Sequence, residues 1–254
     1  HMESFYDLLA SVDMLGVLFD LSTEPHDKLF HLREGTAAEV KIKDVTFKYG
    51  SNTVLKELCL DLSPGEAVAL TGDSGSGKST LIDLLCGLRQ PTTGHIELAG
   101  IDLREIRPDS MRDHLAVARG PEIFHGTIDE NVHLNRSNIR ADDVRDALDC
   151  VGLRDELLQL PDGLNTVLQS GGLPLTTSQA ARLMIARAIC GRPRLLLIDG
   201  TLDGLSDAMI DQVIHNLTRR GRPWTLLVST GRQAVADRCE RTVSPERAFS
   251  DQQV

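Results

Sequence analysis

The sequence lacks a long apolar run, a pair of closely spaced cysteines and an excess of basic residues. No stretch of its 254 residues approaches the ~18 apolar residues of a transmembrane helix. Its five cysteines are scattered without a C-x-x-C pair, which argues against a zinc or redox site. Lys and Arg number 27 and Asp and Glu 37, a net charge of −10, so we expect no nucleic-acid partner. With 41% hydrophobic residues, the composition is that of an ordinary globular protein.

The first third of the chain contains segments with clear periodicity. Apolar residues in 3–21 recur at helical spacing, which predicts a helix. Apolar and polar residues alternate in 38–50 and again in 52–65, so both segments are predicted strands. The short apolar stretch 66–72 predicts a further strand. The apolar stretch 79–88, which follows a Gly-rich loop, predicts a helix.

The remainder of the chain alternates between strand-like and helical patterns. Residues 91–100 predict a turn and a strand, whereas 108–190 are mostly helical in pattern. The continuous apolar runs 194–199 and 224–230 are typical of strands buried on both faces of a sheet. This order of elements predicts an α/β fold with a parallel or mixed sheet, an N-terminal antiparallel sheet and a helical insertion.

A phosphate-binding loop is predicted at residues 72–80, "GDSGSGKST", which fit G-x-x-x-x-G-K-[ST] between a predicted strand and a predicted helix. The glycines allow a tight turn whose backbone N–H groups point at phosphate oxygens. Lys78 would bind the outer phosphates, and Ser79 would offer its hydroxyl to a magnesium ion. An ordinary Gly-Ser loop is the alternative interpretation. The residues predicted to contact the nucleotide are Gly72, Ser74, Gly75, Ser76, Gly77, Lys78, Ser79 and Thr80.

Asp199 ends the apolar run 194–199, well downstream of this loop. P-loop proteins place a second magnesium-site carboxylate at such a strand end. We therefore predict that Ser79 and Asp199 together hold Mg²⁺. The alternative is an aspartate that caps a turn or a helix. The predicted phosphate loop favours the magnesium site over this alternative.

Between about 38 and 240, the chain resembles the nucleotide-binding domain of ABC transporters. The stretch from "VTFKYG" through the phosphate loop to "GHIELAGIDL" is similar to the N-terminal half of that family, and "SQAARLMIARAI" (178–189) is similar to the helix after its signature motif. The segment "IFHGTIDENV" (123–132) resembles the part that exporter-type members place near their membrane domain. The resemblance implies that the ligand is ATP. It also implies that Tyr49 stacks on adenine, the alternative being a core tyrosine at a strand end.

The resemblance further implies a place in a larger protein. Residues 3–36 look like a helical extension from a preceding transmembrane domain, although an unrelated amphipathic helix would show the same pattern. Residues 37–254 would form the nucleotide-binding domain, with a helical subdomain at about 120–185. The implied partners are a transmembrane domain of the same or another chain and a second nucleotide-binding domain, in a homodimer or a heterodimer. The implied location is the cytoplasmic face of a membrane.

The sequence departs from the family pattern at four places. Gly200 stands where the family has a glutamate that handles the attacking water, Arg119 where it has a magnesium-binding glutamine, and Gly231 where it has a switch histidine. A guanidinium has no lone pair for a metal and would repel it, so Arg119 is expected to touch phosphate instead. The fourth departure is in the signature motif, LSGGQ in the family, which aligns with "LTTSQ" (175–179) and so lacks both glycines. There the residues expected to face the nucleotide of the other subunit are Thr176, Thr177, Ser178 and Gln179.

Together with these departures, the resemblance implies an exporter-type domain that couples ATP binding to transport and hydrolyses ATP slowly. Glycine has no side chain to act as a general base, and loss of such a base costs a factor of ~10² to 10⁴ in rate. Asp203, four residues after Asp199, is a weak substitute. One alternative is a non-catalytic nucleotide-binding subunit that regulates an ABC assembly. Another is a P-loop enzyme of a different class, such as a small-molecule kinase, which the resemblance argues against.

Overall fold

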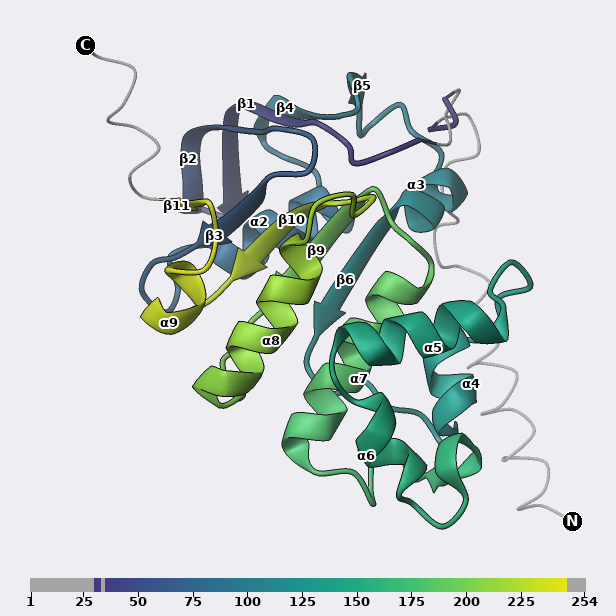
Figure 1. The fold of residues 1–254 in the computed structure, drawn as a ribbon. Coiled ribbons are helices and arrows are strands. Elements are labelled where there is room, and N and C mark those ends of the chain that lie inside the picture. The colour runs from purple at the N-terminus through teal and green to yellow at the C-terminus, as the bar shows by residue number, and fades with distance from the viewer. Residues whose placement is uncertain (1–29, 33–34, 246–254) are drawn as a thin grey trace, which may run out of the picture.

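The computed structural model describes residues 30–32 and 35–245, and its centre is a five-stranded parallel sheet (Figure 1). Every neighbouring pair in this sheet runs parallel. The predicted helix at 3–21 lies outside the described residues. In spatial order, the strands are β11 (Arg241–Val243), β3 (Ala67–Leu70), β10 (Thr225–Ser229), β9 (Leu195–Asp199) and β6 (Leu115–Arg119).

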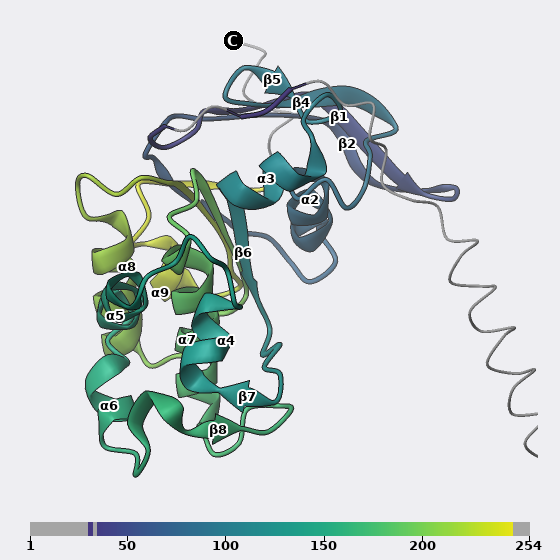
Figure 2. The ribbon, with the colours of Figure 1, turned by 90° about the vertical axis from the view of Figure 1, so that its right-hand side faces the viewer.

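A four-stranded antiparallel sheet lies across one end of the parallel sheet (Figures 1 and 2). Its order is β2 (Asn52–Leu62), β1 (Val40–Tyr49), β4 (Thr93–Leu98) and β5 (Ile101–Asp102). The pairing of β1 with β2 confirms the prediction of an N-terminal antiparallel sheet. A small third sheet pairs β7 (Gly126–Thr127) with β8 (Val167–Leu168).

Helices cover both faces of the parallel sheet and form a separate group beyond β6. The group, which contains α4 to α7, extends away from the antiparallel sheet together with β7 and β8 (Figure 2). Within residues 30–32 and 35–245, no helix is both long enough and apolar enough to cross a membrane. The helices are α2 (Lys78–Leu85), α3 (Pro108–His114), α4 (Ile128–His133), α5 (Ala141–Cys150), α6 (Arg154–Leu158), α7 (Thr177–Cys190), α8 (Asp207–Thr218) and α9 (Gln233–Ala236), with a 3₁₀ turn at Gly163–Asn165.

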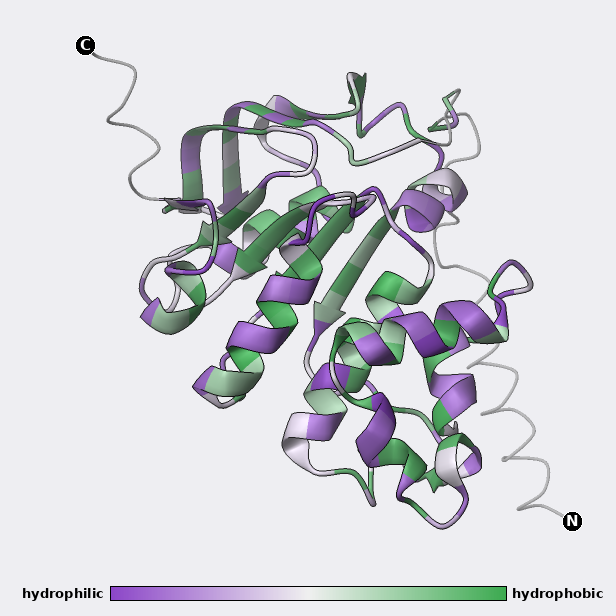
Figure 3. Cartoon of the chain, viewed as in Figure 1, coloured by the Kyte–Doolittle hydropathy of each residue, from purple (hydrophilic) through white to green (hydrophobic). Residues whose placement is uncertain are grey.

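The two faces of the parallel sheet are packed into two different hydrophobic clusters. Because side chains alternate along a strand, Leu196 and Ile198 of β9 join the cluster around α5, α7 and α8. Leu195 and Leu197 of the same strand join the cluster that contains α2 and the antiparallel sheet. Figure 3 shows these central strands as apolar along their length, as the sequence predicts for strands buried on both faces. Asp199, two residues beyond Leu197, therefore faces the side of α2.

The prediction that residues 108–190 are mostly helical is only partly right. The edge strand β6 (Leu115–Arg119) lies within this range and pairs with β9, and the short strands β7 and β8 also lie there. A five-residue segment between helical patterns has too little periodicity to identify it as a strand. Its pairing with β9, which is distant in sequence, is what makes it one.

Candidate functional site

The predicted phosphate loop connects β3 to α2, the strand–loop–helix arrangement that its motif requires. Gly77 caps α2 with φ of +90°, a conformation that favours glycine, and a Cβ there would lie 2.8 Å from the Leu55 side chain. No side chain caps this helix. Its first-turn N–H groups are therefore left for an anion.

Lys78 folds its ammonium group back over the loop. Its Nζ donates to the carbonyl oxygens of Gly72 and Asp73, each at 2.7 Å, and to Ser76 Oγ at 3.3 Å. A phosphate oxygen would bind this ammonium more strongly than neutral carbonyls do, because both partners would then be charged. The loop thus holds the Lys78 ammonium group where a bound phosphate can replace the carbonyl oxygens as its hydrogen-bond partner.

A cavity of about 420 Å³ opens over the loop and gathers residues from distant parts of the sequence. Gly72 and Ser76 belong to the loop without lining the cavity, and neither Arg119 nor residues 176–179 line it. The sequence-predicted residues that do line it are Tyr49, Ser74, Gly75, Gly77, Lys78, Ser79, Thr80, Asp199, Gly200 and Gly231, together with Asp203.

Arg119 lies between two carboxylates. The parallel pairing of β6 with β9 sets Arg119 opposite Asp199 at the carboxyl ends of both strands. Its Nε donates to Asp199 Oδ2 at 3.0 Å, and its Nη2 donates to Asp83 Oδ1 at 2.8 Å. From the sequence we expect Arg119 to touch phosphate; in the structure its guanidinium has these two acidic partners instead.

Asp83 is a residue that the sequence does not single out. It comes four residues after Ser79, so both side chains lie on one face of α2 a turn apart, and this spacing was an available signal. Beside this cluster, burial raises the pKa of the Cys86 thiol to about 12. Cys86 therefore stays a neutral thiol and adds no negative charge to the two aspartates.

The two residues predicted to hold magnesium are neighbours, but a guanidinium already occupies one oxygen of the aspartate. Ser79 Oγ donates to Asp199 Oδ1 at 3.3 Å, while Asp199 Oδ2 accepts from Arg119. A magnesium ion on Oδ1, the oxygen that faces Ser79, would share the carboxylate with the guanidinium on Oδ2. The magnesium site stays a prediction, and Arg119 is a specific argument against it.

Asp203 joins the loop after β9 to the loop after β10. Its carboxylate accepts from the hydroxyl of Thr230 and, at 3.0 Å, from the backbone N–H of Gly231. Arg232 Nη1 donates to the Asp203 carbonyl oxygen at 3.1 Å. Asp203, the possible substitute base, therefore already accepts hydrogen bonds from residues 230–231, where the family has its switch histidine. No local pattern signals the roles of Thr230 and Arg232, because their partners lie far away in sequence.

Gly200 adopts a left-handed backbone conformation immediately after Asp199. Its φ is +67°, and its N–H donates to the Ser229 carbonyl oxygen at 2.9 Å. No atom stands within 4 Å of the position of a Cβ. Backbone conformation rather than crowding is therefore what favours glycine here.

Tyr49 ends β1 at the rim of the cavity. It is 43% exposed, so it is not a core residue. Its ring meets Phe47 edge-on, with centroids 4.9 Å apart, and the Arg89 guanidinium lies 4.8 Å from its centroid. An exposed ring at this place is compatible with the predicted stacking on a base.

The residues aligned with the signature motif form the N-terminus of α7. Thr176 Oγ1 accepts from the Gln179 N–H at 3.2 Å, and Gln179 Oε1 accepts from the Thr176 N–H at 2.9 Å. Thr176 and Thr177 are exposed, and Ser178 is half-buried. These residues do not line this chain's own cavity, and their role toward another subunit stays a prediction.

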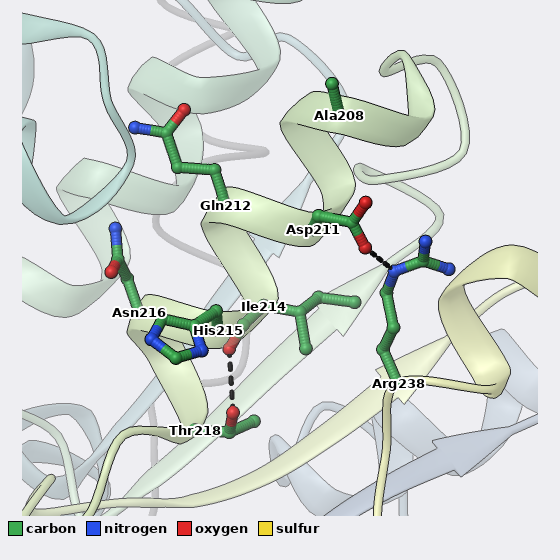
Figure 4. A pocket seen from close by; sticks show the side chains of 8 residues that line it. All are labelled: Ala208, Asp211, Gln212, Ile214, His215, Asn216, Thr218 and Arg238. Carbon is green, nitrogen blue, oxygen red and sulfur yellow. Dashed lines mark hydrogen bonds and ion pairs between the residues drawn. The ribbon is translucent and has the colours of Figure 1, made fainter.

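A second cavity, of about 580 Å³, lies on the outer side of α8 (Figure 4). Asn216 Nδ2, on its rim, donates to the Cys150 carbonyl oxygen at the end of α5 at 2.8 Å. Asp211 pairs with Arg238, and Thr218 Oγ1 donates to the Ile214 carbonyl oxygen. This surface has none of the phosphate-binding elements of the first cavity. The residues drawn are Ala208, Asp211, Gln212, Ile214, His215, Asn216, Thr218 and Arg238.

The parallel sheet, the glycine-rich loop that opens a helix and the aspartate at the end of an adjacent strand define a P-loop nucleotide-binding protein. The ABC transporter family model matches residues 55–202, and the chain belongs to this family. The described residues form its ATP-binding domain, so ATP is the nucleotide that the domain binds.

Relatives of known name match most of this chain but extend well beyond it. The mycobactin import ATP-binding/permease protein of Mycolicibacterium thermoresistibile is 32% identical over 93% of this chain and 41% of its own length. The ATP-dependent lipid A-core flippase of Thiobacillus denitrificans is 34% identical over 79% of this chain and 35% of its own length. The structure of a bacterial Atm1-family ABC exporter with ATP bound shares the fold, with a TM-score of 0.80 at 23% identity over 93% of this chain and 42% of that one. The chain thus spans about two fifths of the length of these relatives.

Proposed function

We propose that this chain is the motor domain of an exporter-type ABC transporter that couples ATP binding, with slow hydrolysis, to transport across a membrane. Its transmembrane domain belongs to the same or a partner chain, residues 3–36 lead from that domain, and 37–254 form the nucleotide-binding domain. The domain works at the cytoplasmic face of the membrane. The relatives described as ATP-binding/permease proteins support this arrangement.

The observation that carries the proposal is an intact phosphate loop beside carboxylates that already have protein partners. Lys78 and the uncapped N-terminus of α2 supply positive charge for the phosphates. Asp199 accepts from Arg119, and Asp203 accepts from Gly231. Gly200, between them in sequence, has no side chain to orient a water. Binding without fast turnover is what this combination supports.

In a head-to-tail dimer, each nucleotide would lie between the phosphate loop of one subunit and the signature residues 176–179 of the other. Thr176 retains a hydroxyl at an exposed helix N-terminus, which suits a phosphate. ATP binding would then close the dimer, and closure would be the step that moves the membrane domain. The alternative is a non-catalytic subunit that regulates a partner, and the absence of a free carboxylate at Asp199 and Asp203 favours it over a fast ATPase.

Equilibrium ATP binding and steady-state phosphate release by the 254-residue chain test the proposal. We expect ATP binding, a loss of at least tenfold in affinity in Lys78→Ala, and a release rate well below the ~1 s⁻¹ at which typical enzymes begin. Asp199→Asn should lower the residual release. Asp146→Asn, which alters an exposed carboxylate on α5, is the matched control and should not.

Three outcomes separate the possibilities. Failure of the wild-type chain to bind ATP contradicts the proposal altogether. Binding with release that Asp199→Asn leaves unchanged, in the chain alone and together with its membrane domain, favours the regulatory subunit. Rapid Asp199-dependent release contradicts the slow-turnover part.

A further inference from the structure

The strongest unexplained feature of the site is that Asp199 has a protein cation bound to it. The side chain of Asp199 is only 9% exposed and that of Asp83 is 17% exposed, so both carboxylates are largely withdrawn from water. Arg119 donates to both, at 3.0 and 2.8 Å, through two different nitrogens. Two buried negative charges beside one another require compensation, and the guanidinium supplies one positive charge to the pair.

Arg119 is held in this place by the fold and not only by its charge. It is the last residue of β6, paired in register with the last residue of β9. Val117 and Leu197, two residues earlier on the two strands, are paired in the same way. Thr201 Oγ1 also donates to the Ala118 carbonyl oxygen at 2.9 Å, which ties the segment after β9 to β6. The strand register therefore fixes the backbone of Arg119 beside Asp199.

A fixed monovalent cation and a divalent metal compete for the same carboxylate. Magnesium takes oxygen ligands in a near-ideal octahedron, and a guanidinium provides no oxygen and no lone pair. To admit the metal on Oδ1, beside Ser79, Asp199 would have to accommodate two positive species, one on each oxygen. The nucleotide has no such conflict, because its phosphates gain from every cation in the site.

We propose that this chain binds ATP as the metal-free nucleotide, with Arg119 providing beside Asp199 the positive charge that a magnesium ion would otherwise bring. This inference rests on the proposed function, since it specifies which form of ATP the same site takes. It follows that magnesium should not strengthen binding. Excess magnesium should weaken it instead, because the metal would draw free ATP into a complex that the site disfavours.

The test compares ATP affinity of the 254-residue chain in excess EDTA and in excess magnesium, by titration calorimetry. For the wild type, we expect affinity in EDTA to equal or exceed that in magnesium. Affinity at least tenfold tighter in magnesium overturns the inference. This comparison uses only the wild-type chain, so it holds even where a variant fails to fold.

A pair of matched variants assigns the effect to Arg119. Arg119→Gln, which removes the charge and adds an amide oxygen, should gain a preference for magnesium of about tenfold or more. Arg104→Gln makes the same change at an exposed residue that pairs with Asp102 on β5, and it should keep the wild-type ratio. A folded Arg119→Gln that keeps the wild-type ratio overturns the role of Arg119.

The outcomes distinguish this inference from the proposed function on which it rests. ATP binding that depends on magnesium in the wild type contradicts the inference and leaves the proposed function standing. No ATP binding in either condition contradicts both. Metal-independent binding that disappears in Lys78→Ala supports both, because it places the nucleotide at the phosphate loop.

Discussion

Single residues at this site have specific partners where a hydrolytic site needs free groups. Asp199 and Asp203 are the acidic residues that line the cavity over the phosphate loop, among the residues the structure describes. Each accepts hydrogen bonds from the protein, Asp199 from Arg119 and Asp203 from Gly231. A carboxylate whose oxygens already accept from fixed donors is poorly placed to orient a water. This is a physical reason to expect that bound ATP persists.

A glutamate introduced at Gly200 alone should not create a fast ATPase. The φ of +67° costs an L-residue about 1–2 kcal/mol, and Arg119 and Gly231 would remain. We expect Gly200→Glu to unfold at lower urea concentration and to leave phosphate release within about twofold of wild type. The triple variant with Arg119→Gln and Gly231→His should raise release tenfold or more, since members of one catalytic constellation act together. A tenfold gain from Gly200→Glu alone would contradict this.

At the scale of elements, α6 and α7 are joined by a buried arginine. Arg182 of α7 is nearly inaccessible, and it donates to both carboxylate oxygens of Glu156 on α6. Gln179, in the first turn of α7, donates to Glu156 Oε2 at 3.0 Å. One carboxylate therefore orients the helix that carries the signature residues 176–179.

The contact between these helices should be lost in acid. Hydrogen bonds from Arg182 hold the pKa of Glu156 below its ordinary value of 4.5, against the opposing effect of burial. A carboxyl whose folded pKa is lowered contributes stability above its unfolded pKa, and this stability disappears as pH falls through the folded pKa. We expect wild type to be more stable than Glu156→Gln near pH 7, with the difference shrinking below about pH 4.5.

Urea unfolding across this pH range provides the measurement. Asp155→Asn is the matched control, because Asp155 lies next to Glu156 on α6 and makes no ion pair within the described residues. The difference in unfolding free energy between Asp155→Asn and wild type should not shrink in the same way as the pH falls. A stability difference for Glu156→Gln that is the same at pH 7 and at pH 3.5 would count against the contact.

At the scale of the whole molecule, ATP binding should drive self-association. The cavity and the exposed Thr176 and Thr177 lie apart on this chain, so a head-to-tail pair would join one subunit's cavity to the other's helix N-terminus. We expect saturating ATP to shift the mass of the 27.8 kDa chain toward a dimer in sedimentation experiments. Because each chain carries a net charge of −10, the dimer should be weaker at low salt.

Two variants control this experiment. Lys78→Ala should stay monomeric because it does not hold the nucleotide. Thr177→Arg, which places a bulky side chain at the exposed helix start, should bind ATP without dimerising. A wild-type chain that stays monomeric with bound ATP would contradict the homodimer, and the heterodimer with a different partner would remain.

Much of the fold follows from local sequence patterns. The alternating segments 38–50 and 52–65 became β1 and β2, the apolar runs 194–199 and 224–230 became β9 and β10, and the motif at 72–80 became the loop before α2. Each of these signals is contained within 14 residues or fewer. The edge strand β6 has no such signal, because its partner lies some 80 residues away, and the sequence pattern predicts a mostly helical region there.

The sequence by itself determined the class of site. Glycines at fixed offsets followed by a lysine and a serine are suited to binding phosphate, and this spacing is visible within residues 72–80. It also identified Arg119, Gly200 and Gly231 as departures. Only the tertiary structure decided what those departures do. The register of β6 and β9 places Arg119 beside Asp199, and one turn of α2 brings Asp83 to the same guanidinium. The loops after β9 and β10 approach each other, so that Asp203 accepts a hydrogen bond from Gly231. Charge compensation depends on distance in space, and no spacing along the chain specifies it.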